Sequence, residues 1–360
     1  MIINACSQAW CSMKSEDIAR LAGVSRSTVS RVINNYSNVP EETRRKVMKV
    51  IEKYSYSPNS SARALAGKKT DTIGLFIVSI AERSSATRVY QNNYFSPFID
   101  AVIDTANAKG IYVLVHSIFS VRDYAKIKQA FIEKRMDAGI IVGTEKDIGV
   151  MADVAAMGYP LVIIDYLPED ILRLAGKGRI AVINSMDDSG TREMIQYLLD
   201  LGHKDIGILA GRDNTYSGRV RYETYRETLI ENGIEPRKEW DLKGEFIKKI
   251  AEQAVGRLIK SGNLPTALFC CNDDMAISAM DVFSRENIKV PDDISIAGFD
   301  DIMPASLVKP ALTTVHVPIY DIARKAVELV LEMIGDTARN ISTYTMETKL
   351  VIRESCKKRG

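Results

Sequence analysis

Short apolar runs recur along the sequence from residue 72 onward, and they limit the possible folds more than any other feature. Amphipathic stretches of helical length separate most of them, and the runs read IGLFIV, YVLVHS, AGIIVG, LVIIDY, RIAVIN, DIGILA, ALFCCN and SIAGFD. Unbroken apolar strands that alternate with helices are typical of parallel sheets covered on both faces. The run at 205–211 restarts the pattern, which favours two doubly wound parallel-sheet α/β subdomains. A (β/α)8 barrel is the architectural alternative.

In front of these runs, residues 16–54 have the pattern of three short helices. Ser15 can cap the first helix, and Gly23, which tolerates the positive φ of a helix C-terminus, ends it. Ser25 can cap the second helix, and the third begins at Pro40 with acidic residues in its first turn. A helix, a glycine turn and a second helix of this kind predict a helix-turn-helix.

The second helix of this motif can lie in the major groove of DNA. Arg26 and Ser27 occupy its leading turn, Arg31 follows one turn later, and arginine pairs with guanine discriminate by about 1–3 kcal/mol each. Short polar side chains such as Thr28 suit phosphates instead. The expected DNA-contacting residues of this segment are Ser25, Arg26, Ser27, Thr28, Ser30, Arg31 and Asn34. The alternative is a solvent-facing polar surface on a small helical bundle.

The charge distribution is typical of a chain with a nucleic-acid-binding head. Residues 1–69 hold 12 Lys and Arg against 5 Asp and Glu, whereas the rest of the chain holds 36 against 41. A basic head on a slightly acidic body indicates a nucleic-acid-binding module joined to a domain that does not bind DNA. The alternative is that these basic residues form a solvent-exposed charged face with no nucleic-acid partner.

A compact helix signal follows at residues 57–67. Ser57 can cap it, Pro58 suits its first helical position and Gly67 closes it. A helix shorter than about a dozen residues does not hold together in water by itself. We therefore expect this segment to become ordered only against a partner.

Polar residues lie where the later strands end, which is where ligands bind in doubly wound sheets. Asp165, Asn272-Asp273 and Asp300-Asp301 each follow a strand, and Arg221 lies among tyrosines beyond DIGILA. Carboxylates, an amide, an arginine and aromatic faces suit a polyhydroxylated ligand such as a sugar, because each buried hydroxyl needs a directed partner. The alternative is that the aspartates cap the helices that follow the strands.

Several other classes of protein are disfavoured. No apolar run approaches the ~18–20 residues that cross a bilayer, so we expect no contact with a membrane. The five cysteines form no C-x-x-C pair and the three histidines lack ligand spacing, so we expect a cytoplasmic protein with reduced thiols, no metal and no cofactor. No G-x-S-x-G, phosphate-loop or H-E-x-x-H motif indicates an enzyme.

The first residues carry no charge pattern of a secretory signal. Met13 lies directly before the first patterned segment. We interpret residues 1–12 as a frayed extension, or as sequence upstream of the start that the cell uses.

Longer motifs run through the chain in a distinctive order. They begin with MKSEDIARLAGVSRSTVSRVINNYSNVPEETRRKVMKVIEKYSYSPNSSARALAGKKTDTIGLF and continue through VIIDY, GTREMIQYLLDLGHKDIGILAG, FCCNDDMAISAM, VPDDISIAGFDDI and PALTTVHVPIYDIARKAVELVLEMI. In this order they resemble the lactose-repressor (LacI/GalR) family over residues 14–355. The resemblance implies a homodimer on a pseudo-palindromic operator, and a periplasmic-binding-protein-like core that closes around an effector.

The resemblance also implies the division of the chain into domains. We expect a helix-turn-helix domain at 14–56, a hinge helix with its linker at 57–70 and an effector-binding and dimerisation core at 71–360. The two subdomains of the core are expected at about 71–165 with 301–330, and at about 166–300 with 331–356.

The family's functional positions can be carried over one by one. Arg26, Ser27 and Arg31 fall where the family reads the major groove. Asn59, Ala62 and Leu65 fall on the hinge helix that enters the minor groove, with Leu65 as the wedge between base steps. For the effector, the matching positions are Asp165, Arg221, Phe246, Asn272 and Asp300.

The sequence departs from the family after the first strand of the core. The family usually has a short loop that ends in Asn-Pro-Phe-Phe, whereas this chain has extra residues at 81–91 and reads Asn92-Asn93-Tyr94-Phe95 without the proline. Tyr94 and Phe95 still match residues that cover the pocket. No leucine-heptad tail follows the strand-like KLVIRESC, which disfavours the family's tetrameric form.

These patterns together predict a DNA-binding transcriptional regulator, a repressor, whose operator affinity is set by a small-molecule effector such as a sugar. One alternative is the same regulator under the control of a protein co-regulator or a non-sugar metabolite. A sugar-processing enzyme is the distant alternative.

Overall fold

The computed structural model of the chain describes residues 13–56, 69–79, 92–143, 148–167, 178–336 and 341–359, together with Asp170 and Ala338. Residues 1–70 and 71–360 form two compact units. The helix predicted at 57–67, the insertion at 81–91 and residues 1–12 lie outside the described residues.

Three helices form the described part of the first unit. They are α1 (Ser15–Ala22), α2 (Arg26–Ile33) and α3 (Glu41–Lys53). Ile18, Val29 and Val47, one from each helix, are fully buried together. Arg44 of α3 also donates hydrogen bonds to Asn35 Oδ1 at 2.6 Å and to Tyr36 O at 2.7 Å, which ties the loop after α2 to α3.

The first helix begins differently from the sequence-based prediction. Lys14, and not Ser15, is the N-cap residue of α1. The Asp17 carboxylate accepts the Lys14 N–H at 3.0 Å, so the acidic residue of the first turn supplies the capping contact. The other two signals are confirmed: Ser25 caps α2 by accepting the Thr28 N–H at 3.1 Å, and Gly23 ends α1 with a φ of 67°.

A six-stranded parallel sheet forms what we call the first half of the second unit. Its order is β11-β5-β4-β3-β1-β2, with every neighbouring pair parallel. The strands are β1 (Thr72–Val78), β2 (Tyr112–Ile118), β3 (Ala138–Val142), β4 (Leu161–Ile164), β5 (Ile180–Ser185) and β11 (Ile341–Met346).

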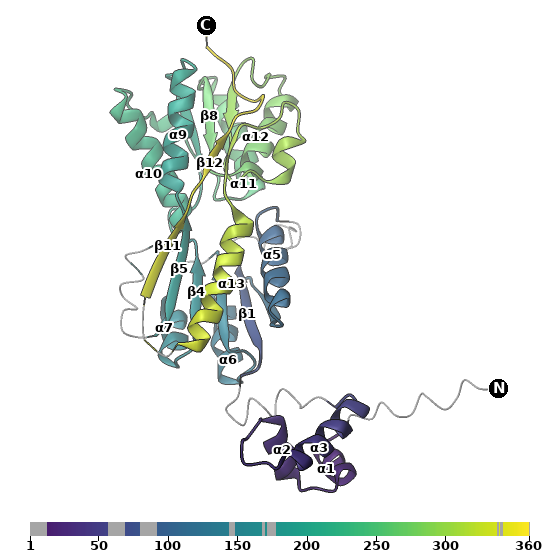
Figure 1. Cartoon of the computed structure of the whole chain (residues 1–360). Coiled ribbons are helices and arrows are strands. Elements are labelled where there is room, and N and C mark those ends of the chain that lie inside the picture. The colour runs from purple at the N-terminus through teal and green to yellow at the C-terminus, as the bar shows by residue number, and fades with distance from the viewer. Residues whose placement is uncertain are drawn as a thin grey trace, which may run out of the picture. The chain divides into compact units, whose positions relative to one another are not determined.

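Helices cover both faces of this sheet, as the apolar runs predict. Ile73, Leu75 and Ile77 of β1 pack in one cluster with α5 (Phe95–Ala108) and α13 (Ile319–Gly335), which lie side by side in Figure 1. The alternate residues Phe76 and Val78 pack in another cluster with α6 (Tyr124–Ile132) and α7 (Ile148–Ala156). A 3-10 turn, η3 (Val121–Asp123), leads into α6.

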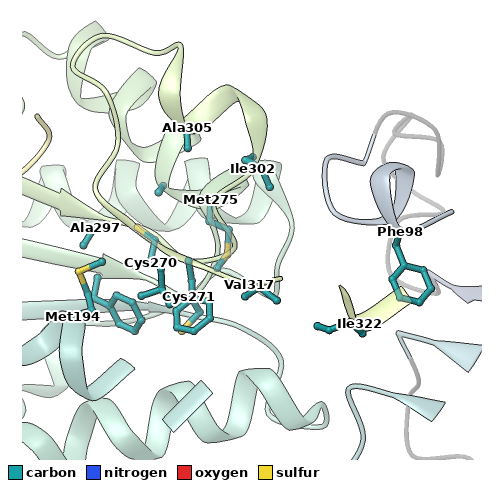
Figure 2. Packing of buried hydrophobic residues seen from close by; sticks show 14 of the residues in the cluster. Phe98, Met194, Cys270, Cys271, Met275, Ala297, Ile302, Ala305, Val317 and Ile322 are labelled. Carbon is teal, nitrogen blue, oxygen red and sulfur yellow. The ribbon is translucent and has the colours of Figure 1, made fainter. Parts of the chain in front are cut away.

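The second half holds a four-stranded parallel sheet with the order β7-β6-β8-β9. Its strands are β6 (Ile206–Ala210), β7 (Asp241–Lys243), β8 (Ala267–Cys270) and β9 (Ser295–Ala297). Its helices are α9 (Asp187–Asp200), α10 (Tyr216–Glu231), α11 (Lys248–Ser261) and α12 (Asp273–Arg285), with 3-10 turns η4 (Lys238–Trp240) and η5 (Met303–Ser306). Figure 2 shows Cys270, Cys271 and Met275 packed in this half, and Phe98 and Ile322 in the first.

The chain crosses between the two halves three times. It passes from β5 to α9, returns between β10 (Thr314–His316) and α13, and leaves again between β11 and β12 (Lys349–Val351). β10 and β12 pair antiparallel beside the second half. The prediction of two doubly wound parallel sheets is confirmed, and the barrel alternative is excluded because the parallel strands form two separate sheets.

The expected subdomain boundaries are wrong at three places. Residues 301–316, expected in the first half, lie with the second, because Thr313 and His316 pair with Ala297 and Asp300 next to β9. Residues 180–185 pair with β4 and residues 341–346 pair with β5, so both segments belong to the first half and not to the second. The first crossing therefore comes after residue 185 rather than at 165. Apolar runs show that strands exist, but the sheet that a strand joins depends on pairing between segments distant in sequence.

Candidate functional site

A cavity lies between the two halves of the second unit, at the carboxyl ends of the strands of the six-stranded sheet. Its volume is about 110 Å³, several times the space that one water molecule needs. Every effector residue expected from the sequence lines it: Tyr94, Phe95, Asp165, Arg221, Phe246, Asn272 and Asp300. The structure thus brings together side chains from Tyr94 to Asp300, which lie far apart in the sequence.

Arg221, in the second turn of α10, is the central charged group of the cavity. Its Nε donates to Asp187 Oδ2 at 2.8 Å, and its Nη1 donates to Cys271 O at 2.5 Å and to Asp300 Oδ1 at 3.2 Å. The guanidinium also stacks 3.7 Å from the centre of the Phe299 ring. No described residue accepts a hydrogen bond from Nη2, so this end of the guanidinium can serve a ligand.

Asp300 follows β9 with a φ of 108°, a strained conformation for a residue other than glycine. Its N–H donates to Val315 O at 2.9 Å, which holds the turn in place. Burial raises the pKa of the Asp300 carboxyl to about 7, because the opposing effect of Arg221 is incomplete. A carboxyl with this pKa can donate or accept a hydrogen bond near neutral pH.

Asp165 reaches across from the first half to the second. Its carboxylate accepts the Ser217 N–H at 2.8 Å and the Ser217 hydroxyl at 3.0 Å, both in the first turn of α10. Asp165 itself has a φ of 61° at the end of β4. Burial, with the charge of Asp187 added to it, raises the pKa of Asp165 to about 6.

Asn272 satisfies both interpretations that the sequence leaves open. Its Oδ1 accepts the Met275 N–H at 2.9 Å and so caps α12, while the residue also lines the cavity. Its neighbour Asp273 is different, because its fully buried carboxylate accepts the Thr314 hydroxyl at 2.6 Å and the Ile302 N–H at 2.9 Å. Asp273 therefore ties the start of α12 to β10 and to the turn after β9, and it does not line the cavity.

Aromatic rings form part of the cavity wall. Tyr94 and Phe95 meet edge to face with ring centres 5.6 Å apart. Burial raises the pKa of Tyr94 well above its ordinary value, so its hydroxyl keeps its proton as a donor. Phe246 lies against Gly211, where an added Cβ would come within 2.1 Å of the ring. Only glycine at 211 leaves room for the ring in this position.

Asp187, Ser217 and Arg212 are functional candidates that the sequence analysis missed. Ser217 and Arg212 line the cavity. The buried Asp187 does not line it but forms an ion pair with Arg221. An aspartate at a strand-to-helix junction is the signal that selects Asp300, and Asp187 carries the same signal. No sequence pattern predicts the contact of Ser217 with Asp165, because the two residues lie 52 positions apart and on different halves.

The helix-turn-helix presents the expected polar surface on α2. Ser25, Arg26, Ser27, Ser30 and Arg31 are exposed, whereas Thr28 and Asn34 are half-buried. The Ser25 hydroxyl is engaged as the cap of α2 and lies 2.8 Å from the Thr28 hydroxyl. Arg26 makes a 3.4 Å contact with Glu16 and is otherwise exposed. Of the other predicted DNA contacts, Asn59, Ala62 and Leu65 lie outside the described residues.

Comparison with known proteins identifies relatives of both units of the chain. Residues 15–59 match the family model for bacterial regulatory proteins of the lacI family, and residues 195–356 match a periplasmic binding protein-like domain. The chain is 33% identical over 345 residues to the probable HTH-type transcriptional repressor ExuR of Bacillus subtilis, covering 95% of this chain and 98% of that one. It is 32% identical over 351 residues to the repressor PurR of Pasteurella multocida, covering 96% and 98%.

The chain belongs to the LacI family of transcriptional repressors. Its structure also resembles the lac repressor dimer bound to operator and an anti-inducer, with a TM-score of 0.77 at 27% identity over 96% of this chain and 99% of that one. The regulator CelR in complex with cellobiose gives a TM-score of 0.71 at 25% identity, over 95% and 99%. This LacI-family repressor therefore has an HTH domain that binds DNA and an effector-binding core, and its relatives are repressors and not enzymes.

None of the helices in the described ranges is both long and apolar enough to cross a membrane.

Proposed function

We propose that this repressor binds its operator as a homodimer and that a small hydroxylated molecule, such as a sugar, sets its affinity for the operator. The observation that carries the proposal is the cavity in which Arg221, Asp300 and Asp165 converge between aromatic walls. Such a site offers directed partners to several hydroxyl groups of one ligand. The lac repressor is a dimer in its operator complex, which supports the same assembly here.

The proposed roles of the cavity residues follow from their contacts. Arg221 donates through Nη2, the carboxyl groups of Asp165 and Asp300 accept from or donate to ligand hydroxyls, and Phe246 packs on the apolar face of the ring. Asn272 offers its amide nitrogen, because its Oδ1 is engaged in capping α12. The ligand then shifts operator affinity by its different affinity for the open and closed forms of the core.

On DNA, we propose that Arg26 and Arg31 of α2 read base edges while Thr28, Ser30 and Asn34 contact phosphates. Both arginines are exposed, and among the described residues no buried partner holds either of them. We place the protein in the cytoplasm, where operator DNA lies.

A thermal-shift screen of the full chain tests the effector. It should include neutral sugars, sugar acids and nucleobases, since aromatic walls also accept planar rings. A ligand present at 100 times its dissociation constant adds about 2.7 kcal/mol to the free energy of unfolding. Each hit is then added to an operator complex, with the operator obtained by selection from random DNA. A small molecule that changes operator affinity supports the proposal, whereas a response only to a protein from cell extract would favour a co-regulator.

A further inference from the structure

The position where the family motif has proline is occupied here by Asn93, and its side chain makes a contact between the two halves. Asn93 Nδ2 donates to Asp274 Oδ1 at 2.9 Å. Asn93 lies just before α5 of the first half, and Asp274 lies in the first turn of α12 of the second half. A carboxylate only accepts hydrogen bonds, so the amide nitrogen of Asn93 is the end that faces it.

Both residues sit at the edge of the cavity without lining it. Asn92 and Tyr94, on either side of Asn93, line the cavity, and so does Asn272 two residues before Asp274. The turn that carries Asn93 is fixed from within, because Asn92 Oδ1 accepts the N–H groups of Tyr94 and Phe95 at 2.9 Å each. The Asn93–Asp274 contact therefore joins the two halves directly beside the cavity.

Residues of the second half orient the Asp274 side chain for this contact. Lys248, the first residue of α11, lies 3.0 Å from the same oxygen, Asp274 Oδ1. The first turn of α12 also favours a negative charge at this position. The side chain of Asp274 is 14% exposed, so water competes only partly for the contact.

We propose that Asn93 and Asp274 form a clasp that favours the closed form of the cavity even when no ligand is bound. A ligand then enters only after the clasp has opened, so the clasp lowers the rates of ligand entry and release. This consequence for ligands rests on the proposed function, whereas the effect on closure does not. A proline at 93 has no side-chain donor, so the clasp depends on the residue by which this chain departs from the family motif.

Hydrogen exchange of the full chain without ligand measures the closure directly. The Ser217 amide is a suitable reporter, because it lies in the first turn of α10 and its partner, Asp165 Oδ1, belongs to the other half. The next amide, Gly218 N–H, donates to Thr215 Oγ1 within the same half and serves as an internal reference. Opening of the cavity should expose the first amide and leave the second protected.

Asn93→Ala and Asp274→Ala should each speed exchange at Ser217 by roughly three- to ten-fold, the range expected for one lost hydrogen bond. The double variant should exchange no faster than either single variant, because both changes remove the same contact. Asn93→Asp places two carboxylates together and should speed exchange at least as much. Asp292→Ala is the matched control, since it removes an exposed ion pair with Lys357 that lies within the second half.

Unchanged exchange at Ser217 in Asn93→Ala, with an unchanged melting curve, would overturn the clasp. So would a double variant whose effects multiply, or a wild-type Ser217 amide that exchanges at the unprotected rate. If Asn93→Ala does not fold, Asn93→Asp and Asp274→Ala decide the matter with the same readout. These results are independent of the effector screen, so the clasp and the proposed effector response can each fail alone.

Discussion

Arg221 Nε lies 2.8 Å from Asp187 Oδ2, and both side chains are almost fully withdrawn from solvent. Asp187 is the first residue of α9, directly after the chain crosses from the first half to the second. Its other oxygen accepts a hydrogen bond from the Ser185 hydroxyl. A single carboxylate thus connects the crossing segment to the arginine of the cavity.

Asp187→Asn should destabilise the core strongly. It removes one partner of a buried ion pair and leaves Asp300 as the one described carboxylate beside Arg221. Loss of one partner of a buried pair costs about 3–5 kcal/mol. Urea unfolding of the full chain measures the change. Asp188→Asn alters the exposed neighbouring residue and should leave the unfolding curve unchanged. An equal and small effect of the two changes would show that the buried pair contributes little.

Asn272→Ser separates the two roles of this residue. Serine caps a helix about as well as asparagine, so the free energy of unfolding should change little, whereas Asn272→Ala should lower it by about 0.5–2 kcal/mol. Both variants lose the amide nitrogen and should bind any hit from the thermal-shift screen more weakly. If the serine variant binds as tightly as the parent protein, Asn272 acts only as a cap.

Stability of the core should fall as pH rises from about 4 to 7. The folded pKa of Asp300 is about 7 and that of Asp165 about 6, against an ordinary value of 3.8. The folded form therefore holds more protons than the unfolded form in this window, and unfolding becomes easier as those protons are lost. Asp300→Asn should flatten the decline up to pH 7, and Asp165→Asn should flatten it up to pH 6. Denaturant unfolding at a series of pH values checks this, and a stability that rises over the window would contradict it.

Arg26→Ala should relax base preference at one operator position, at a cost of about 1–3 kcal/mol for the preferred base. Competition binding with operators varied one base at a time measures it. Arg45→Ala, at an exposed position on α3, should leave base preference unchanged. Weakening that is equal for every sequence would instead place Arg26 on a phosphate.

The sequence predicts the apolar strands well, because β1, β3, β4, β5, β6 and β8 are buried along nearly their whole length. It misses β7 and β10, which have only three residues each, and β11, whose half-buried ISTYTM lacks an apolar run. The cavity residues are found because ligand sites in such sheets collect at strand ends. The contacts of Asp165 with Ser217 and of Asn93 with Asp274 depend on how the two halves meet, which no local pattern encodes.

The three crossings also restrict how the protein can be made. The six-stranded sheet takes its last strand, β11, from residues 341–346, close to the end of the chain. During synthesis from the N-terminus, β5 therefore has an open edge until residues 341–346, far downstream of β5, have left the ribosome. An unpaired edge is a site for association with other chains. We therefore expect a nascent chain to be prone to association through this edge until residues 341–346 emerge.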